Sequence, residues 1–171
     1  MRVDKRRRRE NKTDYSRRIK ILKSLKPRII FRKTNKYIIA QYVVSDAAQD
    51  KVIINSNSKK LLNYGWPEKA SGSLKSLPAS YLTGYLIGKQ IISSNLENPV
   101  VDTGMTRILH KSKVFAFLKG LIDSGIKMEC KKEAFPDDKR LKGEHMKNKV
   151  PFDEILKKIS SEKIKSKESL K

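Results

Sequence analysis

Residues 27–41 read PRIIFRKTNKYIIAQ, two short apolar runs separated by a cationic segment. β-Branched and aromatic residues favour strands, and Thr-Asn tolerates a turn. The stretch therefore predicts a β-hairpin with strands at residues 28–31 and 37–41. Its expected tip, residues 32–36, carries three cations in five residues. Such a tip indicates contact with a polyanion, and the alternative interpretation is a solvated surface loop.

The whole chain is strongly basic, with a formal net charge of +22 over 171 residues. An acidic partner is therefore expected, and nucleic acid carries the densest array of negative charge. No apolar run approaches the length of about 18 residues that a membrane span needs, so we expect no membrane partner and an intracellular protein. The single Cys130 excludes an internal disulfide. Two histidines and one cysteine do not match a zinc site, so we expect no metal and no cofactor.

Charge is unevenly distributed along the chain. Residues 1–36 hold 16 Lys/Arg against 3 Asp/Glu, residues 37–126 hold 10 against 6, and residues 127–171 hold 14 against 9. A balanced middle between basic ends is typical of one globular domain with extensions. We expect a basic RNA-binding arm with a short helix at residues 1–26, an α/β core domain at 27–126, and a basic C-terminal extension at 127–171.

The N-terminal arm has almost no apolar residues in its first 12 positions, which include the arginines from Arg6 to Arg9. It should be disordered without a partner, because nothing offsets the entropy lost on ordering it. Apolar residues then recur at helical spacing between residues 13 and 26, and predict a short basic helix that ends before Pro27. A basic amphipathic helix could also lie on a membrane, but this apolar stripe is narrow and lacks Trp and Phe.

A third strand is predicted at residues 50–55, after an Ala/Asp turn. Ser58 is well placed to cap a short helix over residues 59–63. The following turn contains the only tryptophan, Trp66. This side chain could pack in the core or stack on a base, and packing is the commoner role beside Gly and Pro. Residues 69–76 have the composition of a loop.

The longest predicted helix covers residues 77–92, where Gly84 and Gly88 indicate close contact with the sheet. A short buried strand is predicted within residues 98–104 and a last core helix over residues 113–123. This order of elements gives an α/β domain with a small mixed sheet packed with helices. A three-stranded antiparallel meander comes first, and the fourth strand pairs in parallel after a helical crossover.

Five blocks of sequence resemble one known family, in the family's order. They are residues 28–41, 62–66 (LNYGW), 79–89 (ASYLTGYLIGK), 114–125 (VFAFLKGLIDSG) and 143–145 (GEH). The family is the archaeal form of large-subunit ribosomal protein eighteen, whose eukaryotic counterpart is large-subunit protein five. The resemblance implies a small α/β sandwich and a structural, non-enzymatic role in the large ribosomal subunit, in the cytoplasm. It also implies that 5S rRNA, 23S rRNA and neighbouring large-subunit proteins are partners, with 5S rRNA seated in the central protuberance.

Cationic residues of the arm and the hairpin tip are the candidate RNA contacts. Arginine and lysine neutralise phosphates, and arginine also stacks on unpaired bases. Asn35 could bond a base edge or a 2′-hydroxyl, or only shape the turn. The candidate RNA-binding residues are Arg6, Arg7, Arg8, Arg9, Arg17, Arg18, Arg32, Lys33, Asn35 and Lys36.

Two other classes of protein fit parts of the sequence. A metal-dependent nuclease needs several convergent carboxylates, and only Asp102, at a strand end before Thr-Gly, has a suitable setting. Another basic nucleic-acid-binding protein is allowed by charge, but no helix-turn-helix or zinc spacing is present. We therefore expect no catalytic residue.

A last apolar stripe lies near the C-terminus, where Phe152, Ile155, Leu156 and Ile159 fall at helical spacing. A helix of two to three turns is marginal in water on its own, so this stripe must dock on a surface. That surface is either this protein's own domain or a neighbouring protein. A tail rich in Lys, Ser and Glu follows and ends the chain.

Overall fold

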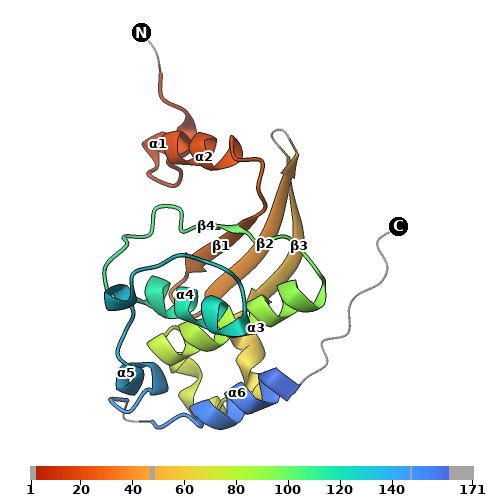
Figure 1. The fold of residues 1–171 in the computed structure, drawn as a ribbon. Coiled ribbons are helices and arrows are strands. Elements are labelled where there is room, and N and C mark those ends of the chain that lie inside the picture. Colours follow the sequence, from red (N-terminus) through yellow and green to blue (C-terminus); the bar gives the residue numbers. More distant parts are fainter. Residues whose placement is uncertain (1–2, 47–48, 147, 162–171) are drawn as a thin grey trace.

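The computed structural model describes residues 3–46, 49–146 and 148–161. Four strands form one mixed sheet in the order β3-β2-β1-β4 (Figure 1). The antiparallel neighbours are β3–β2 and β2–β1, and β4 pairs in parallel with β1. This confirms the predicted meander with a parallel fourth strand. The strands are β1 (Arg28–Lys33), β2 (Ile38–Asp46), β3 (Gln49–Asn57) and β4 (Val100–Asp102).

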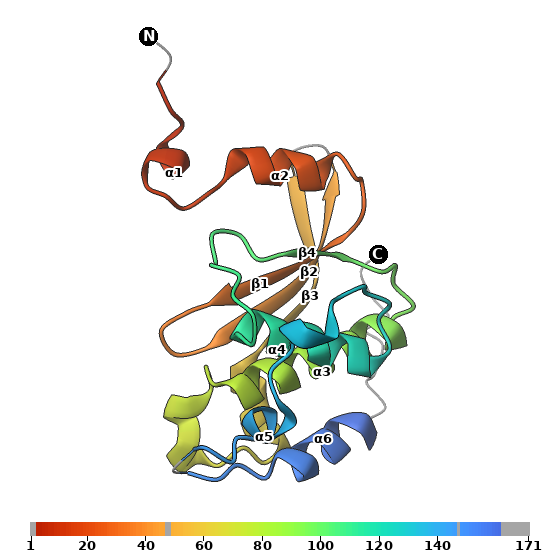
Figure 2. The ribbon, with the colours of Figure 1, turned by 60° about the vertical axis from the view of Figure 1, so that its left-hand side comes forward.

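Helices α3 and α4 cover one face of the sheet in both ribbon views (Figures 1 and 2). Helix α6 lies beyond α3, and α1 and α2 project from the opposite end of the molecule. The α-helices are α1 (Arg6–Arg9), α2 (Tyr15–Leu22), α3 (Leu77–Ser93), α4 (Lys113–Ser124), α5 (Asp138–Lys142) and α6 (Phe152–Ser161). The 3-10 helices are η1 (Ser58–Tyr64), η2 (Glu68–Ser73) and η3 (Lys132–Ala134).

Three local predictions differ from the structure or lie outside it. Ser58 begins η1 but does not cap it, because its Oγ accepts a hydrogen bond from the Ile38 N–H at 3.0 Å. Much of the predicted loop over residues 69–76 forms η2. The Ala/Asp turn before β3 and the tail after residue 161 lie outside the described residues.

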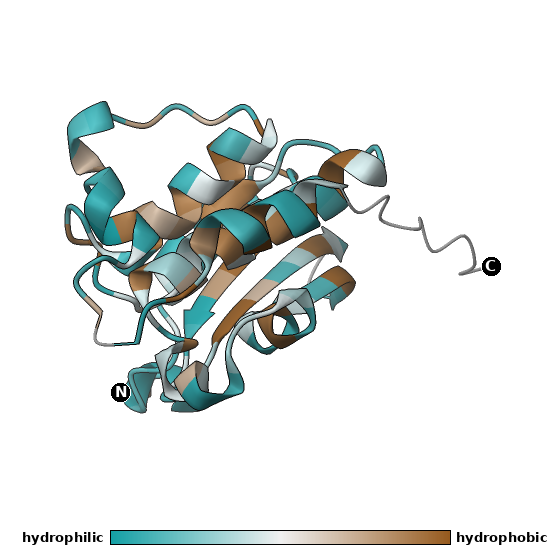
Figure 3. Cartoon of the chain, turned by 90° about the horizontal axis from the view of Figure 1, so that it is seen from below, coloured by the Kyte–Doolittle hydropathy of each residue, from teal (hydrophilic) through white to brown (hydrophobic). Residues whose placement is uncertain are grey.

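Helix α3 separates two hydrophobic clusters. One cluster joins the sheet to α3 and α4, with Phe31 of β1, Ile87 of α3 and Phe117 of α4 among its members. The other joins the opposite side of α3 to η1, α5 and α6. Apolar residues are concentrated where these helices and strands face one another (Figure 3). Because both sides of α3 are covered, Ile87 and Ile91 are buried. Ile92, near the end of the helix, is 46% exposed.

The glycines of α3 contact α4 and not the sheet, so that detail of the prediction was wrong. A β-carbon on Gly84 would overlap the carbonyl oxygen of Phe117, and one on Gly88 would overlap the Ser124 hydroxyl. The contact is reciprocal, since a β-carbon on Gly120 of α4 would overlap the carbonyl oxygen of Tyr81. The two helix backbones therefore come into close contact where they cross, because these glycines place no side chain between them.

The hairpin is longer than predicted. Arg32 and Lys33 belong to β1, where they lie opposite Ile39 and Ile38 of β2. The turn begins at Thr34, whose N–H donates to the Tyr37 carbonyl at 2.9 Å, and whose Oγ1 accepts from the Tyr37 N–H. Successive strand residues point to opposite faces of a sheet, so Arg32 and Lys33 do not share a surface.

Helix α6 docks on the protein's own domain. Ile155 and Ile159 are 0% and 1% exposed, and they belong to the same cluster as Leu61 of η1. Trp66 is buried in this cluster, with its indole N–H bonded to the Ala70 carbonyl, so it packs in the core. The apolar stripe of α6 therefore packs on this protein's own domain, which is one of the two surfaces that the sequence allowed. The division of the chain into three regions stays a prediction.

Shortening one side chain of α6 tests this docking. Ile155→Val removes a single methylene from a fully buried position and should lower the free energy of unfolding by about 1 kcal/mol. Lys157→Ala changes an exposed residue of the same helix and is the matched control. Urea unfolding of the free protein measures both variants. Equal stability of Ile155→Val and wild type would mean that α6 does not dock here in solution.

Candidate nucleic-acid interface

Arg28, the first residue of β1, is the centre of a charge network at one end of the sheet. Its side chain is only 2% exposed. One terminal nitrogen contacts a carboxylate oxygen of Asp102 at 3.2 Å, and the other contacts Asp50 at 2.7 Å. Ser45 accepts a bond from Arg28 and donates one to Asp50. Parallel pairing of β4 with β1 brings Asp102 to this position, and antiparallel pairing brings Asp50 from β3.

The same two carboxylates hold two further arginines. Arg18 of α2 pairs with Asp50 at 2.8 Å, and Arg32 pairs with Asp102 at 3.3 Å and also donates to its backbone carbonyl. Arg17 of α2 donates to the Gly104 carbonyl at 3.2 Å. Helix α2 has no buried residue, so these polar contacts are an important part of what attaches it to the sheet.

Asp50 stays ionised within this network. Burial acts to raise the pKa of its carboxyl group, but the hydrogen bonds from Ser45 and Arg28, with the charges of Arg28 and Arg18, outweigh burial and lower it. A carboxyl whose pKa is lowered by folding stabilises the folded state above its unfolded pKa, and this contribution is lost as pH falls through the folded pKa. Asp50 therefore supplies a negative charge to its arginine partners at neutral pH.

A small cavity of about 100 Å³ lies where the arm meets the end of the sheet, and we call it the arm groove. Of the carboxylates in the described part of the chain, only Asp14 and Asp102 line it. Asp14 caps α2 by accepting from the Arg17 N–H, and Asp102 is already bonded to Arg28 and Arg32. The groove is consequently electropositive. Its cations are Arg7, Lys12, Arg17, Arg18 and Arg32.

The structure brings four of the predicted RNA-binding residues together in the arm groove. These are Arg7, Arg17, Arg18 and Arg32. Arg6, Arg8 and Arg9 lie on α1, where all three are exposed and do not line the groove. The sequence predicts disorder for this arm without a partner, and that stays a prediction.

The expectation that the cations of residues 32–36 gather at one hairpin tip was wrong, because Arg32 and Lys33 lie in β1 and line different cavities. Arg32 points to the arm groove and is paired with Asp102, whereas Lys33 lines a different cavity. Asn35 and Lys36 remain exposed in the turn. The hairpin thus presents its charges in three directions, toward the groove, toward the second cavity and at the turn itself.

A second cationic cavity, of about 390 Å³, was missed by the sequence reasoning. We call it the α4 cavity, because the N-terminus of α4 forms one side of it. Its cations come from residues spread over more than 100 positions of the chain, so no local charge run reveals them. The only sequence signal is the closeness of Arg107, Lys111 and Lys113, which lie at the end of a loop and at the start of α4. The cations are Lys33, Arg107, Lys111, Lys113 and Arg140.

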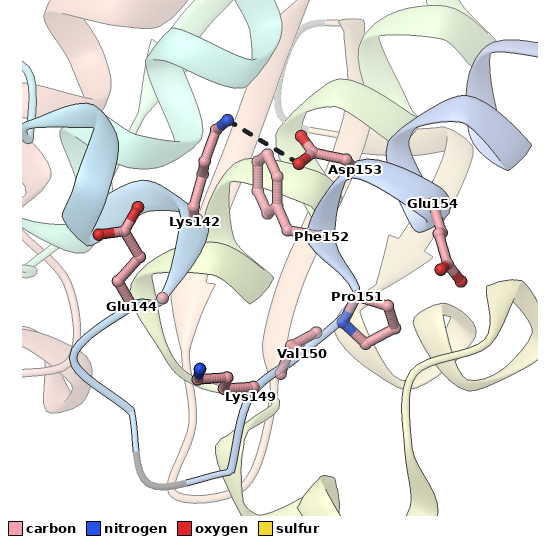
Figure 4. A pocket seen from close by; sticks show the side chains of 9 residues that line it. Lys142, Glu144, Lys149, Val150, Pro151, Phe152, Asp153 and Glu154 are labelled. Carbon is pink, nitrogen blue, oxygen red and sulfur yellow. Dashed lines mark ion pairs between the residues drawn. The ribbon is translucent and has the colours of Figure 1, made fainter.

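A third cavity is not suited to a polyanion. It has a volume of about 630 Å³ and lies beside the N-terminus of α6 (Figure 4). Lys142 and Lys149 are balanced there by Glu144, Asp153 and Glu154, and Lys142 approaches Asp153 at 3.8 Å. Nucleic-acid binding at this cavity would be opposed by its carboxylates.

The carboxylate of Asp102 is fully used by the protein. Besides Arg28 and Arg32, it accepts a bond from the Gly104 N–H at 2.8 Å. Within residues 3–46, 49–146 and 148–161, no three His, Cys, Asp or Glu side chains are grouped to hold a metal ion. The same residues contain no helix long and apolar enough to cross a membrane.

Comparisons of the sequence with known proteins find similarity to large-subunit ribosomal proteins. Residues 1–101 match the model of a family described as ribosomal large subunit proteins 60S L5 and 50S L18. A curated relative from the archaeon Korarchaeum cryptofilum, the large ribosomal subunit protein uL18, is 43% identical over 141 residues. The match covers 82% of this chain and 70% of the relative.

Proposed function

Because the chain belongs to the family of large-subunit ribosomal proteins 60S L5 and 50S L18, we propose that it binds 5S rRNA and helps attach it to 23S rRNA. Membership of the family gives the general role: the chain is a structural protein of the large ribosomal subunit, located in the cytoplasm. The family is not one of enzymes, which confirms that prediction. The position in the central protuberance and contact with neighbouring large-subunit proteins are parts of the proposal.

The observation that supports RNA binding most directly is the arm groove. Its five cations face two carboxylates that are already bonded within the protein. Arg17, Arg18 and Arg32 are held in place before RNA arrives, so less side-chain entropy is lost when a phosphate binds. The guanidinium forks suit phosphate oxygens and the planes of unpaired bases.

The exposed cations outside the groove extend the proposed surface. Arg6, Arg8 and Arg9 on α1 can follow the RNA backbone beyond the groove, because all three are exposed. The ion pairs of Arg6 with Glu10 and of Arg8 with Asp4 are long, at 3.7 Å, and exposed. Lys36 and Asn35 offer a phosphate contact and a hydrogen-bonding side chain at the hairpin turn.

Binding to purified RNA tests the proposal. The full chain should bind 5S rRNA with measurable preference over an unrelated structured RNA of equal length, in equilibrium titrations at fixed salt. Equal affinity for the two RNAs would mean that charge alone drives binding, and the 5S assignment would be wrong.

The salt dependence of that affinity tests the arm groove. Arg7→Ala/Arg17→Ala removes two groove cations and should reduce the slope of log affinity against log salt by roughly 1.5 units. Lys127→Ala/Lys157→Ala removes the same charge from exposed positions on other elements and serves as the control. If both double variants change the slope equally, the groove is not the binding site.

A further inference from the structure

The α4 cavity is built from five parts of the fold, of which the N-terminus of α4 is one. Phe31 and Lys33 come from the end of β1, and Leu77 begins α3. The loop between β4 and α4 contributes Arg107 and Leu109, and α5 contributes Arg140. A volume of about 390 Å³ lies within the range of small-molecule sites, about 300 to 1,000 Å³. The cavity is therefore large enough for more than a single phosphate group.

Four of the five cations of this cavity form no ion pair with a described residue. Among the residues that the structure describes, no carboxylate lines the cavity. Lys111 pairs with Asp137 at 3.1 Å, but Lys33, Arg107, Lys113 and Arg140 form no ion pair within the described part of the chain. Burial lowers the pKa of Lys113, and the nearby charges of Lys33 and Lys75 lower it further. An anion bound among these side chains would relieve their mutual repulsion.

The N-terminus of α4 adds hydrogen-bond donors to the same place. Ser112 occupies the N-cap position, yet its side chain makes no capping bond. Its Oγ is buried and has no partner among the described residues. The N–H groups of Lys113, Val114 and Phe115 likewise have no acceptor there. Free N–H groups and the helix dipole favour an anion at this end of a 12-residue helix.

The cavity also has an apolar side. Phe31, Leu77 and Val114 are buried residues that line it, and Leu109, 49% exposed, stands at its edge. An inorganic anion gains nothing from apolar walls, whereas the face of a nucleobase does. The combination of a cationic, donor-rich end with an apolar wall is the chemistry of a nucleotide site.

We propose that the α4 cavity binds one unpaired nucleotide of ribosomal RNA, with its phosphate at the N-terminus of α4 and its base against Leu77 and Leu109. The inference rests on the proposed function, because it takes ribosomal RNA as the partner. It concerns a separate site, since Arg32 lines the arm groove and the adjacent Lys33 lines the α4 cavity. The protein then holds RNA at two points on opposite faces of its hairpin.

Binding of the full chain to purified 5S rRNA and to purified 23S rRNA, measured as separate probes, tests the cations. Arg107→Ala/Arg140→Ala removes two exposed side chains, so the melting temperature should be unchanged. Affinity for at least one of the two RNAs should fall by about tenfold or more. Lys127→Ala/Lys157→Ala should leave affinity nearly unchanged at physiological salt, because charges remote from the RNA are screened. Equal losses in the two double variants would overturn the assignment.

Chemical footprinting of the bound RNA tests the base. Wild-type protein should protect an unpaired base from modification, and Leu109→Ser, which changes no charge, should remove that protection. Protection that survives Leu109→Ser and Arg107→Ala/Arg140→Ala would overturn the assignment. If the cavity variants weaken binding but wild-type protein protects no base, the cavity contacts only a phosphate group. That result would also overturn the assignment of a nucleotide site. If wild-type protein binds neither RNA, the proposed function itself fails, which is a different result from failure of the cavity variants alone.

Discussion

Replacing Gly120 with alanine is expected to lower the free energy of unfolding by about 3 kcal/mol. The added β-carbon would overlap the carbonyl oxygen of Tyr81, and it would lie 2.9 Å from the Tyr85 nitrogen. Both are backbone atoms of α3, which cannot rotate away as a side chain can. The helices must therefore separate, and this loosens the packing of Phe117 against the sheet. Alanine favours a helix by about 1 kcal/mol over glycine, which offsets only part of the loss.

The matched control for this substitution is Gly72→Ala, because nothing lies within 4 Å of the β-carbon that it would add. Urea unfolding should show wild-type stability for the control and a clear loss for Gly120→Ala. Unchanged stability in Gly120→Ala would show that α3 and α4 do not cross with their backbones in contact.

Replacing Asp102 with asparagine should cost about 3 kcal/mol of unfolding free energy. The substitution keeps the shape of the side chain and an oxygen for the Gly104 N–H, but it removes the charge. Arg28, only 2% exposed, would then keep Asp50 as its one anionic partner. Breaking a buried ion pair costs about 3 to 5 kcal/mol, and the remaining Asp50 contact places this case at the lower end.

Asp138→Asn is the control for the loss of charge. Asp138 pairs with Lys119 at 2.6 Å, but its side chain is 80% exposed, and such surface pairs contribute little. Thermal or urea unfolding at neutral pH should therefore separate the two variants. Equal stability of Asp102→Asn and Asp138→Asn would contradict a structural role for the Arg28 network.

Local patterns predicted most of the sheet, yet they misplaced the hairpin tip. Charged Arg32 and Lys33 were assigned to the turn because turns are rich in polar residues. Their long side chains are compatible with a strand whose partner residues, Ile38 and Ile39, are apolar. The faces to which Arg32 and Lys33 point follow from the alternation of side chains along β1. The predicted strand ended two residues early, at residue 31, and so left both residues out of this alternation.

The sequence could not predict the two cationic cavities, because each joins residues that are distant in the chain. The Arg28 network depends on the parallel pairing of β1 with β4, which brings Asp102 across 74 residues. The α4 cavity likewise needs Lys33 and Arg140 to meet at one helix terminus. The stripe of α6 was predictable from its spacing, but its docking surface is assembled from η1, α3 and α5. The spacing of apolar residues in one helix shows that one face of it must be buried. It does not show which other part of the fold buries that face.

The RNA that accompanies the protein in cells tests the central claim most directly. The native protein should be recovered from cell extract after the ribosomes are dissociated into ribonucleoprotein fragments under mild salt, and the copurified RNA should be sized and sequenced. The proposed function predicts that 5S rRNA is retained in stoichiometric amount, and that Arg7→Ala/Arg17→Ala reduces its recovery relative to Lys127→Ala/Lys157→Ala. Recovery of other RNA in place of 5S rRNA, or of no RNA at all, would contradict it.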